Sequence, residues 1–321
     1  MERQFYYRGD TLDCKETVLC GIINVTPDSF SDGGKYFGVE LAVQRAKELI
    51  AQGAKMLDIG GESTRPGSTY VDIQEEINRV VPVVKAIKSF SDIPISVDTW
   101  KSEVAQATID AGVDIINDIT GLLGDKNMAK VIGNSDVGFI AMFNPVIARP
   151  HHESSKIFPK FTKEDVFTEK EQFTFDSMPI HDVMSYYFKK VLSIAQKNGI
   201  SKNRMMLDVG IGFGLTKREN FMLLNHLSDI HQLGCCAFLG VSRKRFITTL
   251  LEENHFDVDM SSEKGVDNRD EASAVLTALA AVQGVEVLRV HTIPKHLMAI
   301  KIADAVRMVE QVEDENLKAY Q

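Results

Sequence analysis

The sequence predicts an α/β protein, a single (β/α)8 TIM barrel with extended loops after strands five and seven. Short apolar, β-branched segments alternate with longer segments in which apolar residues recur every three or four positions, a pattern typical of parallel β/α units. Polar residues follow these apolar segments, as they do at the mouth of a barrel. The chain has 321 residues, which accommodates a barrel of about 250 residues plus insertions.

The elements follow in order along the chain. Residues 18–25 form the first expected strand, and apolar positions 39, 42, 43, 46, 49 and 50 then define one helical face. The second unit has a strand at 56–59 and helical positions 73, 77, 80, 84 and 87, and the third has a strand at 93–97 and helical positions 104, 107 and 111. The other strands are expected at 113–116, 137–142, 205–207, 237–239 and 287–290, and the last three precede helical patterns.

Two stretches are longer than a β/α connection requires. Residues 145–181 are rich in Pro, Phe, Lys and Glu without a sustained period, and residues 253–269 form a second excursion. No internal repeat or Gly/Ser linker divides the chain, so we expect an N-terminal lead-in at 1–17, one barrel domain at 18–310 and a C-terminal tail at 311–321. A doubly wound open sheet is the structural alternative, because periodicity does not show whether a sheet closes.

Composition argues against several classes of function. A formal charge of −9 and a pI near 5.4 leave no basic stripe for a nucleic-acid backbone. No apolar run approaches the roughly 18 residues of a membrane helix, so we expect a cytoplasmic protein with neither nucleic-acid nor membrane partners. The four cysteines and eight histidines lack zinc-site spacing, which argues against a transition-metal site built by the protein alone.

Polar residues lie directly after the expected strands, where a barrel places its site. Each position alone is compatible with a turn or a helix cap. Eight polar strand ends in register favour a functional mouth instead. The residues are Asn24, Thr64, Arg65, Asp98, Asn117, Asn144, Asp208, Ser242, Arg243, Lys244, Arg289 and His291.

One group of these side chains suits a flat heterocycle. Asp98, Asn117 and Asp208 offer acceptors and a donor to a ring edge with N–H, amino and carbonyl groups. Lys244 suits a carbonyl or ring nitrogen of the same ring, and the glycines around Phe213 allow backbone to approach a flat ligand.

A second group suits an anion. Arg65, Arg243, Arg289 and His291 supply cationic donors for a phosphate or a carboxylate. The residue types together indicate a site for a flat ring and an anion.

Two long signatures make the chain resemble the dihydropteroate synthases. Residues 21–34 read Gly-Ile-Ile-Asn-Val-Thr-Pro-Asp-Ser-Phe-Ser-Asp-Gly-Gly, and residues 58–67 read Asp-Ile-Gly-Gly-Glu-Ser-Thr-Arg-Pro-Gly. Shorter matches follow in family order at 96–101, 116–119, 208–216, 240–246 and 289–291. The resemblance spans 18 to about 310, and the Phe-Asn-Pro at 143–145 with the excursion behind it resembles Gram-positive bacterial members.

The resemblance implies a transferase of alkyl or aryl groups in folate biosynthesis. Such enzymes condense 6-hydroxymethyl-7,8-dihydropterin diphosphate with 4-aminobenzoate to give 7,8-dihydropteroate and pyrophosphate. The implied mechanism is dissociative, SN1-like substitution, in which a delocalised pterin-methylene cation is captured by the arylamine. The resemblance also implies magnesium as cofactor, the two substrates as partners and a homodimer, for which helical residues 299–309 are a candidate interface.

Residue roles are carried over by motif. The resemblance implies that Asp98, Asn117, Asp208 and Lys244 hold the pterin, and that Asn24 binds magnesium with the diphosphate. The loops after strands one and two are expected to close over the site. The implied aminobenzoate pocket comprises Thr64, Arg65, Phe213, Ser242 and Lys244; the implied diphosphate ligands are Arg289 and His291; and the implied catalytic set is Arg65, Lys244, Arg289 and His291.

Two positions depart from the family pattern. Val209 replaces the proline of Asp-Pro-Gly and loses its fixed φ, so pterin placement is expected to be looser. Thr292 replaces the aspartate of Arg-Val-His-Asp, and catalysis would fall if that carboxylate orients His291 or a metal-bound water. These departures motivate the alternative of a catalytically impaired pterin-binding paralogue. A second alternative, a pterin-dependent methyltransferase domain, would usually lack the signature at 24–34.

Overall fold

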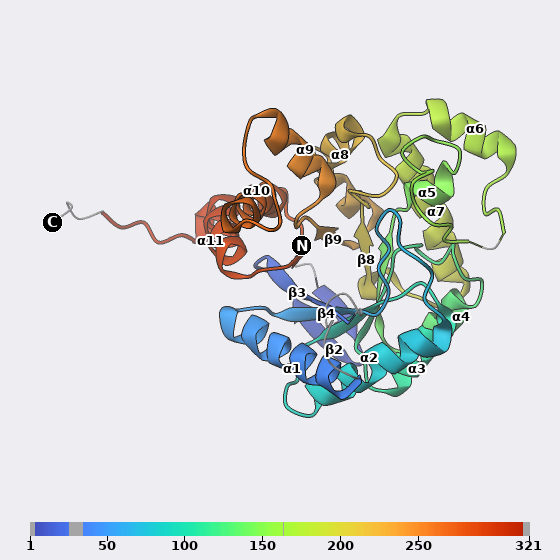
Figure 1. Ribbon diagram of the computed structural model, residues 1–321, viewed down its shortest axis with the longest axis horizontal. Helices are drawn as coiled ribbons and strands as arrows, with labels where there is room; N and C mark the ends of the chain where they lie inside the picture. The colour runs from blue at the N-terminus through green and yellow to red at the C-terminus, as the bar shows by residue number, and fades with distance from the viewer. Residues whose placement is uncertain (1–3, 26–34, 163, 317–321) are drawn as a thin grey trace.

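The computed structural model describes residues 4–25, 35–162 and 164–316, and it confirms the expected closed barrel. Eight parallel strands pair in the order β10-β3-β4-β5-β6-β7-β8-β9, with helices around them (Figure 1). The strands are β3 (Val18–Asn24), β4 (Met56–Gly60), β5 (Ile95–Asp98), β6 (Ile115–Asp118), β7 (Gly138–Met142), β8 (Met205–Asp208), β9 (Cys236–Gly240) and β10 (Val287–Val290).

The longer helices that follow the strands bury an apolar face against the barrel. In α2 the positions expected from periodicity lie on the packed face, where Val80, Val84 and Ile87 are fully buried and Glu76 is buried beside them. The helices are α1 (Lys35–Gln52), α2 (Ile73–Lys88), α3 (Ser102–Asp110), α4 (Met128–Gly133), α5 (Pro145–Ala148), α6 (Glu169–Ser177), α7 (Ile180–Lys197), α8 (Lys217–Leu224), α9 (Arg245–Glu253), α10 (Glu263–Val282) and α11 (Pro294–Arg307).

The N-terminal lead-in contains a hairpin that the sequence analysis did not predict. Strands β1 (Gln4–Tyr7) and β2 (Asp10–Asp13) pair antiparallel, with Phe5 opposite Leu12. Both side chains pack in a core cluster with Val18, Met56 and other residues from the barrel strands. A Cβ on Gly138 would lie 2.4 Å from the Phe5 ring, so glycine makes room for that ring. The hairpin therefore packs against the N-terminal end of the barrel, opposite the end where barrels place their sites.

Both excursions contain helical structure that periodicity did not reveal. In the first, α6 begins at a capping box between Thr168 and Glu171 and buries only Gln172 and Phe175, so it has no apolar stripe to detect. In the second, α10 begins within the expected loop, where the Ser262 side chain accepts a hydrogen bond from Gly265 N. Within the described residues, no helix has the length and apolar content needed to cross a membrane.

Candidate active site at the mouth of the barrel

Strand register brings the polar strand ends together. Asn24 pairs with Gly60, Gly60 with Asp98, and Asp98 with Asn117, so these residues occupy neighbouring positions at the carboxyl ends of β3 to β6. Asp208 ends β8 at the same end of the barrel. The sequence-predicted convergence of these side chains is therefore present.

A buried network of acids and one arginine forms the floor of the mouth. Arg289 Nε donates to Asp58 Oδ2 at 2.5 Å, and Arg289 Nη2 donates to Asp98 Oδ2 at 3.2 Å. Asp58 is fully buried and also accepts hydrogen bonds from Ser96 Oγ at 2.5 Å and Asn117 Nδ2 at 3.3 Å. These bonds fix the guanidinium and leave Nη1 without a hydrogen bond to any described residue.

Asp58 is a site residue that the sequence analysis did not single out. It lies within the apolar segment Met56–Gly60, where a charged side chain has to face the barrel interior and find a cationic partner. A single carboxylate within an apolar strand is the sequence feature that could have identified Asp58 as a site residue.

Burial changes the protonation of the two acids that face the mouth. It raises the pKa of Asp98 to about 7; Arg289 opposes this shift and Asp58 adds to it. Burial also raises the pKa of Asp208, although a hydrogen bond from Gly210 N at 2.8 Å and the charge of Lys244 favour its ionised form. Asp98 consequently exchanges its proton near neutral pH.

Lys244 is held between a glycine and an aromatic ring. A Cβ on Gly212, whose φ is +86°, would lie 2.9 Å from Lys244 Cδ, so the glycine leaves space for the lysine chain. The ammonium lies 5.1 Å from the centre of the Phe213 ring. Burial lowers its pKa to about 8, and Asp208 opposes that shift. Phe213 in turn stacks on Phe158 of the first excursion, with 5.6 Å between ring centres.

His291 is held at the mouth by Ser242 and is surrounded by cations. Its Nδ1 lies 2.9 Å from Ser242 Oγ, which also accepts a hydrogen bond from the His291 backbone N–H at 3.3 Å. Burial first, and then the charges of Arg289 and Arg243, hold the pKa of His291 well below its usual value. The imidazole is therefore neutral at neutral pH in the ligand-free protein and offers a hydrogen bond rather than a positive charge.

Arg243 and Asn144 each have partners among the described residues. Arg243 binds Asp270 of α10 through Nε and Nη2, at 2.7 and 2.8 Å, so its hydrogen-bonding groups are engaged by a helix while its charge still acts on His291. Asn144 is fully buried, accepts a hydrogen bond from Val146 N and donates one to Ile119 O. It caps the N-terminus of α5, which is the structural role that the sequence analysis gave as the alternative for a polar residue after a strand.

Of the two departures from the family pattern, Val209 is buried, and Thr292 is half-buried with its hydroxyl oxygen turned away from solvent. Val209 is 1% exposed, and Thr292 Oγ1 is buried without a hydrogen-bond partner among the described residues. Because Ser242 binds Nδ1 of His291, the histidine does not depend on residue 292 for its orientation.

The loop after β4 lies on the open side of the site. Thr64 is half-buried and Arg65 is exposed, with no ion pair to a described residue. The charge of Arg65 acts on Lys244 and His291, because it lowers the pKa of both. Residues 26–34 lie outside the described residues, and with them the predicted closure of the loop after the first strand.

The described residues offer little for a metal ion. Among them, no group of three or more His, Cys, Asp or Glu could hold one. Asn24 is half-buried, and a Cβ on Gly60 would lie 3.7 Å from Asn24 Oδ1. A cation here would take one neutral oxygen from Asn24 and most of its ligands from a bound substrate.

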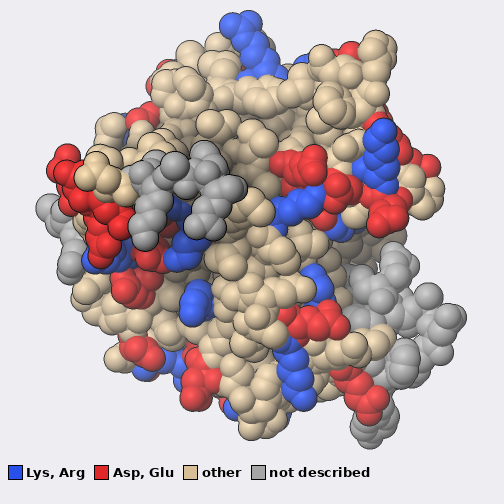
Figure 2. All heavy atoms as spheres, turned by 90° about the vertical axis from the view of Figure 1, so that its left-hand side faces the viewer, with Lys and Arg blue, Asp and Glu red and all other residues tan. Residues whose placement is uncertain are grey.

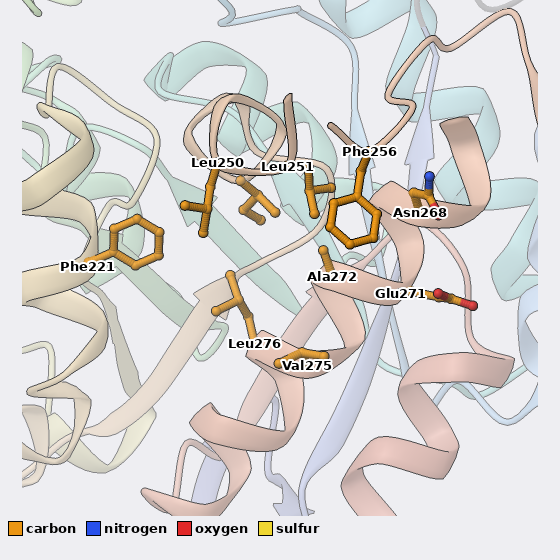
Figure 3. Close-up of a pocket in the computed structure, with 10 residues that line it drawn as sticks. Phe221, Leu250, Leu251, Phe256, Asn268, Glu271, Ala272, Val275 and Leu276 are labelled. Carbon is orange, nitrogen blue, oxygen red and sulfur yellow. The ribbon is translucent and has the colours of Figure 1, made fainter. Parts of the chain in front are cut away.

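A cavity of about 300 Å³ lies elsewhere, between α8, α9 and α10. Leu250, Leu251 and Phe256 face Ala272 and Leu276 across it (Figure 3). Its lining is apolar except for Asn268 and Glu271, and it contains none of the residues that converge at the mouth. We therefore assign the chemistry to the mouth.

The chain is similar to dihydropteroate synthases over most of its length. Residues 20–291 match the family described as pterin binding enzyme. The dihydropteroate synthase of Clostridium beijerinckii is 36% identical over 293 residues, covering 91% of this chain and 95% of that one. That of Bacillus subtilis is 36% identical over 292 residues, covering 91% and 89%.

Solved structures give the same result. A dihydropteroate synthase from Clostridium difficile with pteroic acid superposes with a TM-score of 0.75 at 38% identity, over 91% of this chain and 97% of that one. One from Xanthomonas albilineans with 4-aminobenzoic acid has a TM-score of 0.78 at 32% identity, over 96% and 99%.

Proposed function

The chain belongs to the pterin-binding enzyme family, and from this premise we propose how its residues carry out the dihydropteroate synthase reaction. The protein is a transferase of folate biosynthesis that joins 6-hydroxymethyl-7,8-dihydropterin diphosphate to 4-aminobenzoate and releases pyrophosphate. One observation supports the residue assignments best. The buried network around Arg289, Asp58 and Asp98 brings hydrogen-bond donors and acceptors together at one end of the barrel.

Asp98, Asn117, Asp208 and Lys244 hold the pterin in this proposal. All four lie at the mouth, and both acids have raised pKa values. Asp98 can therefore accept from a ring N–H when ionised or donate to a ring nitrogen when protonated. Asn117 is anchored through its Nδ2 to Asp58, which leaves its Oδ1 to accept from the ligand.

Arg289 and His291 serve the diphosphate. Bringing a diphosphate beside His291 opposes the effect of the surrounding cations and raises the pKa of the imidazole, so the histidine can gain a proton as the anion binds. A protonated His291 and the Arg289 guanidinium then stabilise the charge that develops on the leaving group.

Magnesium is proposed as the cofactor, with Asn24 as its protein ligand. A single amide oxygen suits Mg²⁺, which usually keeps several waters and binds through substrate phosphates rather than an all-protein cage. When bound it supplies positive charge against the diphosphate.

The reaction proceeds by dissociative substitution. The C–O bond between the pterin methylene and the diphosphate breaks, and its electron pair leaves with pyrophosphate. The arylamine nitrogen forms the C–N bond and then gives up a proton, which the released pyrophosphate accepts. Thr64, Arg65, Phe213, Ser242 and Lys244 hold the aminobenzoate close to the carbon, which removes the need for a strong base because the arylamine is already nucleophilic. A closed loop after β4 excludes water that would otherwise capture the cation.

Pyrophosphate release tests this function. The enzyme is expected to release pyrophosphate from the pterin diphosphate only when magnesium and 4-aminobenzoate are both present. Thr292→Asp is expected to change turnover little, because Ser242 already binds His291. Pterin binding without release, restored by Thr292→Asp, would instead identify the impaired paralogue.

We also propose a homodimer formed through α10 and α11. Both helices expose apolar side chains at helical spacing. On this face of the molecule, uncharged surface lies between scattered patches of Lys, Arg, Asp and Glu (Figure 2). Exposed apolar stripes of this kind mark interaction surfaces. The residues are Val275, Leu279 and Val282 on α10 and Met298, Ile302 and Val306 on α11.

A further inference from the structure

Lys101 is a buried cation that the proposed mechanism does not use. It lies three residues after Asp98, and its side chain is 3% exposed. Its ammonium donates to Val71 O and to Glu76 Oε2, both at 2.6 Å, and lies 3.0 Å from Glu62 Oε2. A buried ammonium that makes this many contacts holds its partners in one arrangement.

The hydrogen-bond and ion-pair partners of the Lys101 ammonium all belong to the loop after β4 or to the helix that follows it. Glu62 begins the loop, Val71 ends it and Glu76 lies in the first turn of α2. The Tyr70 ring also lies under the ammonium, at 4.2 Å from its centre. Lys101 therefore ties the start and the end of the segment 62–71 to one point.

Glu62 completes this attachment. Its Oε1 accepts a hydrogen bond from Val71 N at 2.8 Å, and its Oε2 accepts one from Trp100 Nε1 at 2.9 Å. The Trp100 ring in turn packs edge-on against Phe161 of the first excursion, with 6.2 Å between ring centres. The loop is thus fixed to the end of β5 on one side and faces the excursion on the other.

The residues between the two attachment points are Thr64 and Arg65, which the proposed function assigns to 4-aminobenzoate. Without Lys101, the Glu62 and Glu76 carboxylates would lie close together in a buried site without a cation. Such an arrangement is unfavourable, and an outward movement of the loop that brings Glu62 to water relieves it. That movement would displace Thr64 and Arg65 while leaving the pterin acids in place.

We propose that Lys101 is a positioning residue for the aminobenzoate side of the active site, acting through Glu62 on the loop that carries Thr64 and Arg65. The proposal rests on the proposed function, because it assumes that this loop binds aminobenzoate. Trp100 is the second attachment in the same arrangement.

Steady-state kinetics of Lys101→Met test the proposal. We expect the KM for 4-aminobenzoate to rise about tenfold or more, because small displacements of positioning groups have effects of that size. The KM for the pterin diphosphate should stay within about twofold of wild type, because the pterin residues do not contact Lys101. Equal increases in both KM values, or an unchanged KM for aminobenzoate, would contradict the proposal.

Lys88→Met is the matched control. Lys88 pairs with Asp114 at 2.5 Å, at the C-terminal end of α2 and the opposite end of the barrel. This variant also removes a partly buried ion pair and is expected to lower stability, but it should leave both KM values unchanged. A rise in the KM for aminobenzoate in Lys88→Met would show that the effect follows from lost stability alone and would overturn the proposal.

Trp100→Phe decides the question if Lys101→Met does not fold. It removes the indole N–H that donates to Glu62 but keeps an aromatic ring beside Phe161. We expect a KM for aminobenzoate about threefold higher, from the loss of one hydrogen bond to a carboxylate, with no change for the pterin diphosphate. An unchanged KM for aminobenzoate would refute the proposal.

Hydrogen exchange tests the positioning role of Lys101 independently of the proposed enzymatic function. Amides of residues 61–72, including Val71 N–H, should exchange faster in Lys101→Met or Trp100→Phe and at the wild-type rate in Lys88→Met. This measurement does not require turnover, so absent activity in the wild type would refute the function alone. Unaltered exchange in the variants would refute the positioning role.

Discussion

Replacing Asp58 by Asn should separate the stability of the active-site network from its protonation. The substitution keeps the size of the side chain but removes one of the two carboxylates that hold Arg289. Arg289 Nε would lose its 2.5 Å bond to Asp58, and the 3.2 Å bond to Asp98 would remain. Removing one partner of a buried ion pair costs about 3–5 kcal/mol. Because Asp98 still compensates the guanidinium, we expect the lower part of that range.

The same change should lower the pKa of Asp98. Asp58 contributes to raising that pKa to about 7, and Arg289 opposes the rise. Removing the Asp58 charge takes away a repulsion and frees Arg289 to approach Asp98, so both effects favour the ionised carboxylate. If ionised Asp98 binds the pterin, the acid limb of kcat/KM for the pterin diphosphate should move to lower pH.

The assay is a pH profile of kcat/KM together with a thermal melt. The Asp58→Asn variant should melt at lower temperature and reach full kcat/KM at a lower pH than wild type. Asp304→Asn is the control, because Asp304 is buried and pairs with Arg307 at 2.7 Å on α11, far from Asp98 in the sequence and without contact to it. It should lower stability without moving the acid limb. An unmoved limb in Asp58→Asn would refute the coupling between Asp58 and Asp98.

Four further outcomes are expected. Thr292→Val should leave the free energy of unfolding unchanged or raise it by up to about 1 kcal/mol in denaturant unfolding, because it removes a buried hydroxyl without a partner. A lower free energy of unfolding would mean that the hydroxyl has a hydrogen-bond partner. Gly212→Ala should cost about 1–3 kcal/mol and lower kcat/KM, because its φ is +86° and the new Cβ would meet the Lys244 side chain; wild-type kinetics would contradict this. Ile302→Asp should convert a dimer to a monomer in sedimentation, since that side chain is 64% exposed on α11; an unchanged sedimentation coefficient would exclude this face. Removing magnesium with a chelator should abolish pyrophosphate release and leave binding of a pterin without diphosphate intact, which calorimetry can measure.

Most of the barrel could be predicted from the sequence because buried parallel strands are continuous apolar segments. All eight expected strands lie within about two residues of those observed. The hairpin at Gln4–Asp13 was missed because its strands are only four residues each and alternate with polar side chains. The helix α6 was missed because it buries too few residues to show a period.

The site was predictable as a set of strand ends, but the partners of its charged groups were not. Sequence position cannot distinguish an arginine that faces the mouth from Arg243, whose partner Asp270 lies on a helix further along the chain. The lowered pKa of His291 likewise depends on its burial first, and then on cations that include Arg243 and Arg65 from other parts of the chain as well as its near neighbour Arg289. Asp58 was overlooked because its partner, Arg289, is 231 residues away.

Closure of the barrel has a consequence for the synthesis of the protein. Strand β10 pairs with β3, so the barrel closes only when Val287 lies beside Val18. Nearly the whole chain therefore has to be synthesised before β3 can pair with β10, one of its two neighbouring strands. Until then β3 and β9 present unpaired backbone, which is a template for association with other chains. Nascent or prematurely terminated chains that lack residues 287–290 should consequently depend on chaperones far more than the finished protein does.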